Sequence, residues 1–159
     1  MPNVNVSLSA EVHSALEQDA RTANLRASDQ AVRIVENHLI ARGLLNEDVK
    51  AEIALARSLV DRAVEEALRI VEREGFRPSI TFDAIQAVCR DASWLQDYST
   101  LIQDDPFKTG SPRKQTINQN LGYFIKKAVG ANSVVGPSGR PINTKVKGSI
   151  IQSYTPLAL

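Results

Sequence analysis

The feature that most constrains the fold lies at the start of the chain, where polar and apolar residues alternate strictly from Asn3 to Leu8. Alternation with a period of two is typical of a strand with one buried and one solvated face. Helical patterns follow at once, and the next segment that resembles a strand lies near the C-terminus. A lone strand leaves both of its edges unpaired. We therefore expect a second copy of the chain to supply the partner, in a two-stranded antiparallel ribbon across a dimer axis.

Three helices are expected directly after this strand. Ser9 is a suitable N-cap for a helix that ends near Thr22. Ser28 is expected to cap a second helix, which Gly43 is placed to end. A longer helix is expected over residues 46–75, where apolar residues recur every three or four positions.

The rest of the chain predicts further helices and a small β-rich tail. Residues 81–102 read as one broken helix or two short ones, and residues 104–114 as a loop because of their Pro, Gly and Ser content. Thr116 is expected to cap a helix that ends near Val129. Residues 133–154 resemble two strands joined by a long basic loop. The fold class is therefore mainly α with minor β.

Composition narrows the functional class. The 159 residues are 43% apolar and 23% charged, as in soluble globular proteins, and neither a membrane span nor a secretory leader is evident. A single cysteine, Cys89, and two histidines give no basis for a disulfide framework, a metal site or a cofactor. Cys89 lies on a helical stripe and is interpreted as a packed thiol. We expect a cytoplasmic protein that is not an enzyme and does not bind a membrane.

Charge is strongly segregated along the sequence. Residues 1–45 hold four basic and five acidic side chains, and residues 46–105 hold seven basic and thirteen acidic ones. From Pro106 onward there are eight basic residues and no acidic residue. Segregation of this kind indicates that one part of the chain binds a charged partner.

The first 45 residues resemble the ribbon-helix-helix DNA-binding superfamily typified by the Arc and MetJ repressors. The resemblance rests on the strand "NVNVSL", on "SAEV" at the start of the first helix and on "ASDQAVRIV" at the start of the second. It implies an intertwined dimer whose ribbon enters the major groove of double-stranded DNA. The implied base contacts are Asn3, Asn5 and Ser7, because asparagine can bond adenine in a bidentate pair and serine can donate or accept. The opposite reading is that these three residues are only the solvated side of the ribbon.

The resemblance also assigns the dimer core and one phosphate site. The core positions are Val4, Val6, Leu8, Ile34, Val35 and Leu39. The phosphate is expected at the N-terminus of the second helix, at Arg26, Ala27 and Ser28, where free backbone N–H groups and the helix dipole favour an anion.

The predicted domains are residues 1–45 for dimerisation and DNA binding, residues 46–77 as a long connecting helix, and a C-terminal α+β domain at residues 78–159. In the last domain, a basic helix followed by a hairpin has the order of the recognition helix and wing of winged-helix domains. Arg140, Lys145 and Lys147 are then expected to contact DNA phosphates. The alternative is a small α+β domain whose basic surface serves oligomerisation beyond the dimer or binds a protein.

The leading functional hypothesis is a homodimeric, sequence-specific transcriptional repressor of bacterial, plasmid or phage type. Two alternatives remain open. One is the antitoxin of a toxin–antitoxin pair, and the other is an accessory DNA-binding protein for plasmid partition or conjugation.

Overall fold

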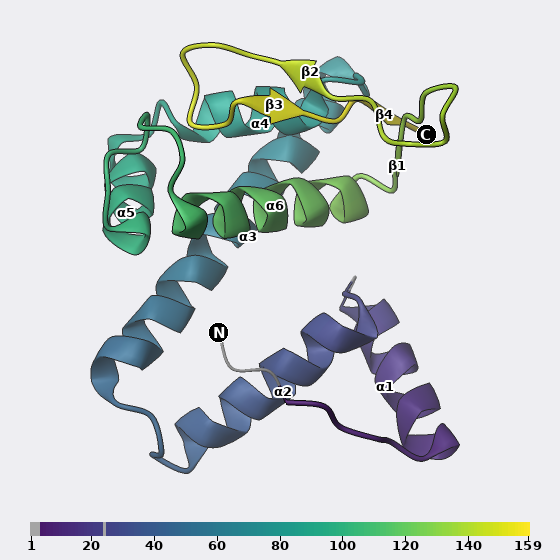
Figure 1. The fold of residues 1–159 in the computed structure, drawn as a ribbon, viewed down its shortest axis with the longest axis vertical. Coiled ribbons are helices and arrows are strands. Elements are labelled where there is room, and N and C mark those ends of the chain that lie inside the picture. Colours follow the sequence, from purple (N-terminus) through teal and green to yellow (C-terminus); the bar gives the residue numbers. More distant parts are fainter. Residues whose placement is uncertain (1–3, 24) are drawn as a thin grey trace. The chain divides into compact units, whose positions relative to one another are not determined.

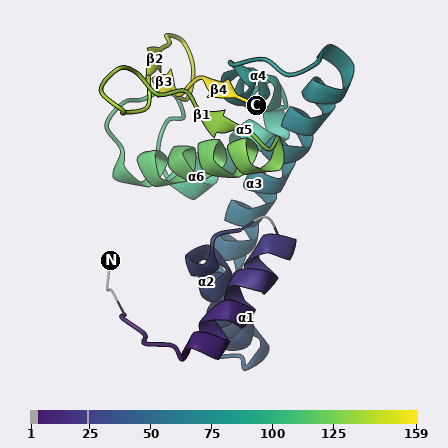
Figure 2. The ribbon, with the colours of Figure 1, turned by 90° about the vertical axis from the view of Figure 1, so that its right-hand side faces the viewer.

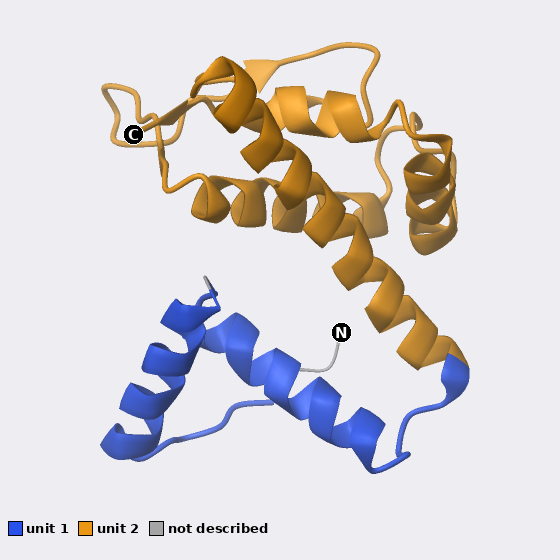
Figure 3. Cartoon of the chain, turned by 180° about the vertical axis from the view of Figure 1, so that it is seen from behind, with its two compact units in different colours: residues 1–47 blue, residues 48–159 orange. Residues whose placement is uncertain are grey.

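The computed structural model describes residues 4–23 and 25–159. These residues form six helices and four strands of two residues each (Figure 1), which confirms the expected class of mainly α with minor β. The chain divides into two compact units, residues 1–47 and 48–159 (Figure 3), which we call unit 1 and unit 2.

Unit 1 contains the helices α1 (Ala10–Thr22) and α2 (Ala27–Ala41). The prediction for α1 is confirmed, because Ser9 is its N-cap and the Ser9 Oγ accepts a hydrogen bond from the backbone N–H of Val12 at 3.4 Å. After α1 the chain turns back, and the N–H of Leu25 donates to the carbonyl oxygen of Ala20 at 2.8 Å. This bond closes the end of α1 and starts the approach to α2.

The prediction that Ser28 caps α2 is wrong. Arg26 occupies the N-cap position, and no side chain makes a capping hydrogen bond there. The Arg26 side chain instead pairs with Asp29 in the first turn, with its Nε 2.7 Å from Oδ2. Ser28 lies within the first turn of the helix and is exposed.

The long helix α3 (Glu47–Glu74) opens unit 2. Its second half buries five side chains against the helices that follow, namely Leu59, Val60, Ala63, Ala67 and Ile70. The helix expected to connect two domains therefore supplies part of the core of unit 2 and does not stand outside it.

Two short helices come next, as one of the two sequence alternatives predicted. They are α4 (Ile80–Val88) and α5 (Ala92–Ile102). Asp91 separates them and caps α5 by accepting a hydrogen bond from the N–H of Ser93 at 2.8 Å. Helix α5 is fixed to α3 by Trp94, whose Nε1 donates to the carbonyl oxygen of Leu59 at 3.1 Å.

The last helix, α6 (Pro112–Ala128), begins earlier than predicted. Its N-cap is Ser111, and the Ser111 Oγ accepts a hydrogen bond from the N–H of Lys114. Thr116 therefore lies inside the helix and does not cap it. The Ser-Pro pair was the signal for the true start, since proline suits the first helical position, which needs no N–H partner.

The tail forms two strand pairs where one pair was expected. The strand β1 (Asn132–Ser133) pairs with β4 (Leu157–Ala158), and β2 (Thr144–Lys145) pairs with β3 (Ser153–Tyr154), both antiparallel. Strands β2 and β3 form a hairpin whose Tyr154 ring stacks on Phe82 of α4, with ring centroids 5.5 Å apart. Figure 2 shows this β-rich segment beside α4 and α6 within unit 2.

Candidate nucleic-acid interface

The N-terminal segment of unit 1 presents apolar side chains to solvent in the single chain. Val4, Val6 and Leu8 are 85%, 72% and 43% exposed, and residues 4–8 pair with no other strand in the described part of the chain. Asn5 and Ser7 alternate with them and are also exposed. Asn3, the third residue expected to read bases, lies outside the described residues. The described residues 4–9 form no strand in the single chain, so the ribbon strand stays a prediction that requires a second copy.

Helix α2 also lacks a cover for its apolar residues. Ile34 and Val35 are 48% and 55% exposed, Leu39 is half-buried, and no residue of α2 is buried. Among the described residues of unit 1, the buried ones are Ala20 and Leu25. So few buried apolar side chains cannot balance the conformational entropy that two ordered helices lose.

The N-terminus of α2, where a phosphate is expected, has no capping hydrogen bond from the side chain at its N-cap position. Because no side chain caps it, the first backbone N–H groups of α2 are available to an anion. Arg26 contributes less charge than expected, since both Nε and Nη2 donate to the Asp29 carboxylate, at 2.7 and 3.1 Å. Ala27 is half-buried and Ser28 is exposed. The backbone and the Ser28 hydroxyl are therefore better placed for a phosphate than the guanidinium.

The basic tail of unit 2 separates into two groups of side chains. Arg140, Lys145 and Lys147 are exposed, and no ion pair is found for them in the described part of the chain. Lys145 and Lys147 flank the half-buried Val146, so both point to the outer face of this extended segment. These three cations are free to meet phosphates.

The second group of cations is already engaged by the protein. Lys114 is only 5% exposed, and its Nζ donates to the carbonyl oxygens of Pro106 and of Lys108, the latter at 2.7 Å. Burial lowers the pKa of Lys114, against the opposing effect of Asp105 and Asp104. Lys114 is thus a structural residue that holds the loop before α6, a role that its sequence context does not signal.

Other interactions in the tail are weaker. Lys108 pairs with Asp104 at 3.2 Å, and Arg113 lies 3.8 Å from Glu52 of α3. Both pairs are largely exposed and contribute little to stability.

The described residues were also compared with the requirements of a metal site and of a reactive thiol. No group of three or more His, Cys, Asp or Glu side chains among them is placed to hold a metal ion. Cys89 is half-buried, and burial raises the pKa of its thiol to about 11, so little thiolate is present at neutral pH. No helix in the described part of the chain is long and apolar enough to cross a membrane.

Three comparisons with known proteins found nothing similar: no family model, no curated protein and no solved structure matches this chain.

Proposed function

We propose that this protein is a homodimeric, sequence-specific DNA-binding protein of the ribbon-helix-helix type, acting as a transcriptional repressor. The observation that carries the proposal is the uncovered apolar surface of unit 1, on the segment Val4–Leu8 and on Ile34 and Val35 of α2. A second copy would cover both surfaces at once if the two N-terminal segments paired as an antiparallel ribbon. The same pairing would satisfy the backbone groups of residues 4–8.

The ribbon would present Asn5 and Ser7, with Asn3, on the face opposite the valines. An uncharged polar face suits base reading, because amides and hydroxyls discriminate base edges whereas lysine and arginine add mostly phosphate affinity. A ribbon of two strands also fits the width of the major groove.

Phosphate contacts would fix the ribbon in the groove. The N-terminus of α2, with Arg26, Ala27 and Ser28, supplies backbone N–H groups for one phosphate. Unit 1 has a slightly acidic balance, so most of the cationic charge would come from Arg140, Lys145 and Lys147 in the tail. In this proposal the hairpin of unit 2 acts as a wing that touches the backbone.

One observation favours the repressor over the antitoxin. Unit 2 has its own core, centred on large side chains that include Trp94, Tyr98 and Leu121, all with 0% exposure. A segment that folds by itself does not need a toxin to order it. An accessory role in plasmid partition or conjugation uses the same DNA-binding surface and stays open as an alternative.

The test compares base reading with general DNA affinity. A binding site is first selected from random duplexes with the full-length protein, and Asn5→Ala is then measured on that site and on unrelated DNA. We expect a loss of about 1–3 kcal/mol per bidentate contact on the selected site and little change on unrelated DNA. Gln18→Ala, which removes an exposed amide from α1, is the matched control and should change neither affinity. Equal losses on both DNAs, or none, would show that Asn5 does not read bases.

A further inference from the structure

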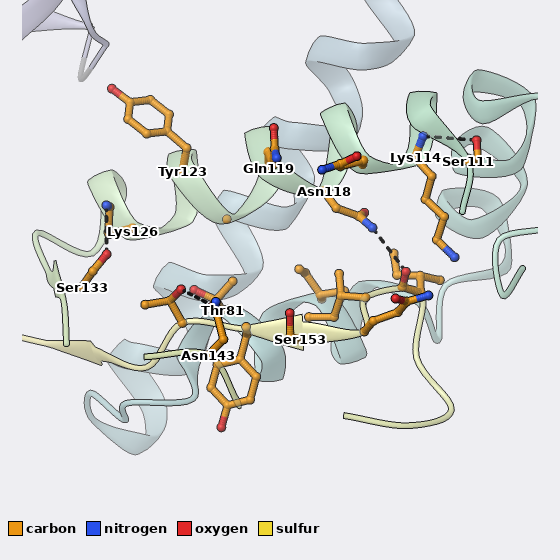
Figure 4. Close-up of a pocket in the computed structure, with 18 of the residues that line it drawn as sticks. Thr81, Ser111, Lys114, Asn118, Gln119, Tyr123, Lys126, Ser133, Asn143 and Ser153 are labelled. Atoms are coloured by element: carbon orange, nitrogen blue, oxygen red, sulfur yellow. Dashed lines mark hydrogen bonds between the residues drawn. The ribbon is translucent and has the colours of Figure 1, made fainter. Parts of the chain in front are cut away.

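Unit 2 contains a pocket of about 710 Å³, which the proposed DNA-binding surface does not use. It lies between α6 on one side and the β2–β3 hairpin on the other, with Thr81 and Ile85 of α4 at its base (Figure 4). Its volume is in the range of sites that hold small molecules and cofactors. Arg140, Lys145 and Lys147 do not line it.

One wall of the pocket is a single face of α6. Several of its residues recur every three or four positions, which places them on one stripe of the helix, and they are Gln115, Asn118, Gly122 and Lys126. The N-cap Ser111 and the buried Lys114, whose Nζ is bonded to backbone carbonyls, also line the pocket. The opposite wall comes from the hairpin and includes Gln152, Ser153 and Thr155. Amide and hydroxyl groups therefore face each other across the space.

The charge of the pocket is entirely positive. No Asp or Glu is found among the described residues that line it, because its walls come mostly from the part of the chain after Pro106. Lys126 lines one end, where its Nζ donates to the Ser133 hydroxyl at 3.2 Å and has no carboxylate partner in the described chain (Figure 4). A cation beside a hydroxyl, with no acid to neutralise it, is suited to an oxyanion such as a phosphate.

Asn118, on the α6 wall, is fixed by hydrogen bonds to two other elements. The Asn118 Oδ1 accepts a hydrogen bond from the Tyr98 hydroxyl at 2.8 Å, and its Nδ2 donates to the carbonyl oxygen of Ile150 at 3.2 Å. These two bonds fix the side chain and join α6 to both α5 and the hairpin. A wall that is fixed before a ligand arrives lowers the entropy that binding must offset.

Apolar side chains also line the pocket, namely Ile85, Ile150, Ile151 and Leu157. We propose that the pocket binds a sugar phosphate, with the phosphate at Lys126 and Ser133, the ring against these apolar side chains and its hydroxyls toward the amides. Inorganic phosphate would use only the Lys126 end, and a neutral sugar would leave that cation without an anion. The sugar phosphate belongs either to a free metabolite or to a nucleotide.

Gly122 supports the presence of an open space beside α6. Glycine in the middle of a helix weakens it relative to alanine. A Cβ built at Gly122 would meet only the Thr81 Cγ2, at 3.9 Å, which is ordinary contact. An alanine therefore fits there without strain, while a longer side chain would extend into the pocket.

The first experiment titrates the full-length protein with ribose 5-phosphate by calorimetry, in the absence of DNA. Ribose and inorganic phosphate should each bind at least about tenfold more weakly, since each can reach only part of the pocket. Lys126→Gln should weaken ribose 5-phosphate binding by about tenfold or more, because it removes a charge-assisted bond. Lys127→Gln is the matched control: Lys127 is the exposed neighbour that does not line the pocket, and its replacement should leave affinity unchanged.

A second pair of variants tests the location. Gly122→Leu should abolish binding by filling the pocket, whereas Gly122→Ala should retain it. Adenosine monophosphate shows whether the ligand is a nucleotide or a free sugar phosphate. If it binds more tightly than ribose 5-phosphate, the pocket is assigned to a nucleotide. If it binds more weakly, the pocket is assigned to a free sugar phosphate.

Three results would overturn the proposal. One is the absence of binding by either phosphorylated probe at about 10 mM, a concentration at which even a weak specific site would be occupied. Another is an equal fall in affinity in Lys126→Gln and Lys127→Gln, which would indicate general attraction to a basic surface. The third is unchanged affinity in Gly122→Leu with native Trp94 emission. If that variant does not fold, the two lysine variants decide the question.

Discussion

The two units differ most in how much of their apolar surface they bury. Unit 2 has a continuous core in which Trp94 and Tyr98 stack with ring centroids 5.3 Å apart and neither is exposed. Unit 1 has two well-formed helices, yet the buried residues in its described part are Ala20 and Leu25. A single chain therefore completes one unit and leaves the other without a core, which is the pattern expected when only the first unit is built to fold with a second copy.

This difference has a thermodynamic consequence. If unit 1 folds only as a dimer, its stability depends on protein concentration, because assembly and folding are one equilibrium. Unit 2 should unfold at a midpoint that does not depend on concentration. Trp94, the single tryptophan of the chain, reports on unit 2 alone in fluorescence.

The largest expected effect comes from a charge placed in the proposed dimer core. Val6→Asp should dissociate the dimer and unfold unit 1, since burying an unpaired carboxylate costs several kcal/mol. Sedimentation equilibrium of the full-length chain measures the dimer, and Trp94 emission should stay native. Ser7→Asp adds the same charge to the opposite face of the strand and should leave the dimer intact. A Val6→Asp protein that remains dimeric would remove the ribbon from the proposal.

The next effect concerns the core of unit 2. Leu121 is fully buried in α6, and Leu121→Ala should lower the free energy of unfolding by about 2–5 kcal/mol, because apolar burial decreases and a cavity forms. Urea titration followed by Trp94 emission measures this change, and the dimer should persist. Leu68→Ala, at a position 45% exposed on α3, is the control and should change the stability by about 0.5 kcal/mol or less. A midpoint that shifts with protein concentration would show that unit 2 also depends on assembly.

The third prediction tests whether the basic residues of unit 2 contribute to DNA binding. Replacing Arg140, Lys145 and Lys147 together with Gln should weaken binding to specific and random DNA alike. The slope of log affinity against log salt should fall by about 0.9 for each phosphate that the protein no longer neutralises. Arg113→Gln, which removes a cation already close to Glu52, should leave the slope nearly unchanged. An unaltered slope in the triple variant would favour the alternative in which the basic tail binds a protein.

Local signals made the helices predictable. The start of α1 at Ser9 and the break at Asp91 follow from capping residues, which act within one turn. The same rule failed at α2, where Arg26 occupies the N-cap position without a capping side chain, and at α6, where the pair Ser111 and Pro112 comes before Thr116. The ribbon itself stays a prediction, since its proposed partner strand belongs to another chain.

The tail and its pocket could not be read from the sequence, because both depend on distant contacts. The pairing of β1 with β4 joins Asn132 to Ala158 across the whole tail. Lys114 is one of the eight basic residues after Pro106, and only the folded loop shows its Nζ among backbone carbonyls. The acid-free composition after Pro106 was visible, but the sequence does not say which cations face a pocket and which face outward.

The smallest expected effect is an acid sensitivity that belongs to unit 2. Hydrogen bonds from the hydroxyl and N–H of Ser93, and then from Arg62, lower the pKa of Asp91 from its ordinary 3.8 to about 2. Because the folded-state pKa is the lower one, the contribution to stability is present above about pH 4 and disappears as the pH falls towards 2. Asp91→Asn should retain the cap of α5 but flatten the pH dependence of unit 2 stability across that interval, as followed by Trp94 emission in urea. Ser93→Ala removes the hydroxyl whose hydrogen bond lowers the pKa of Asp91 most, and should flatten the same interval in part. If the stability of unit 2 depends on pH in the same way in Asp91→Asn and in the natural protein, down to about pH 2, the prediction is wrong. The Asp91 carboxylate would then not link the folding of unit 2 to proton binding.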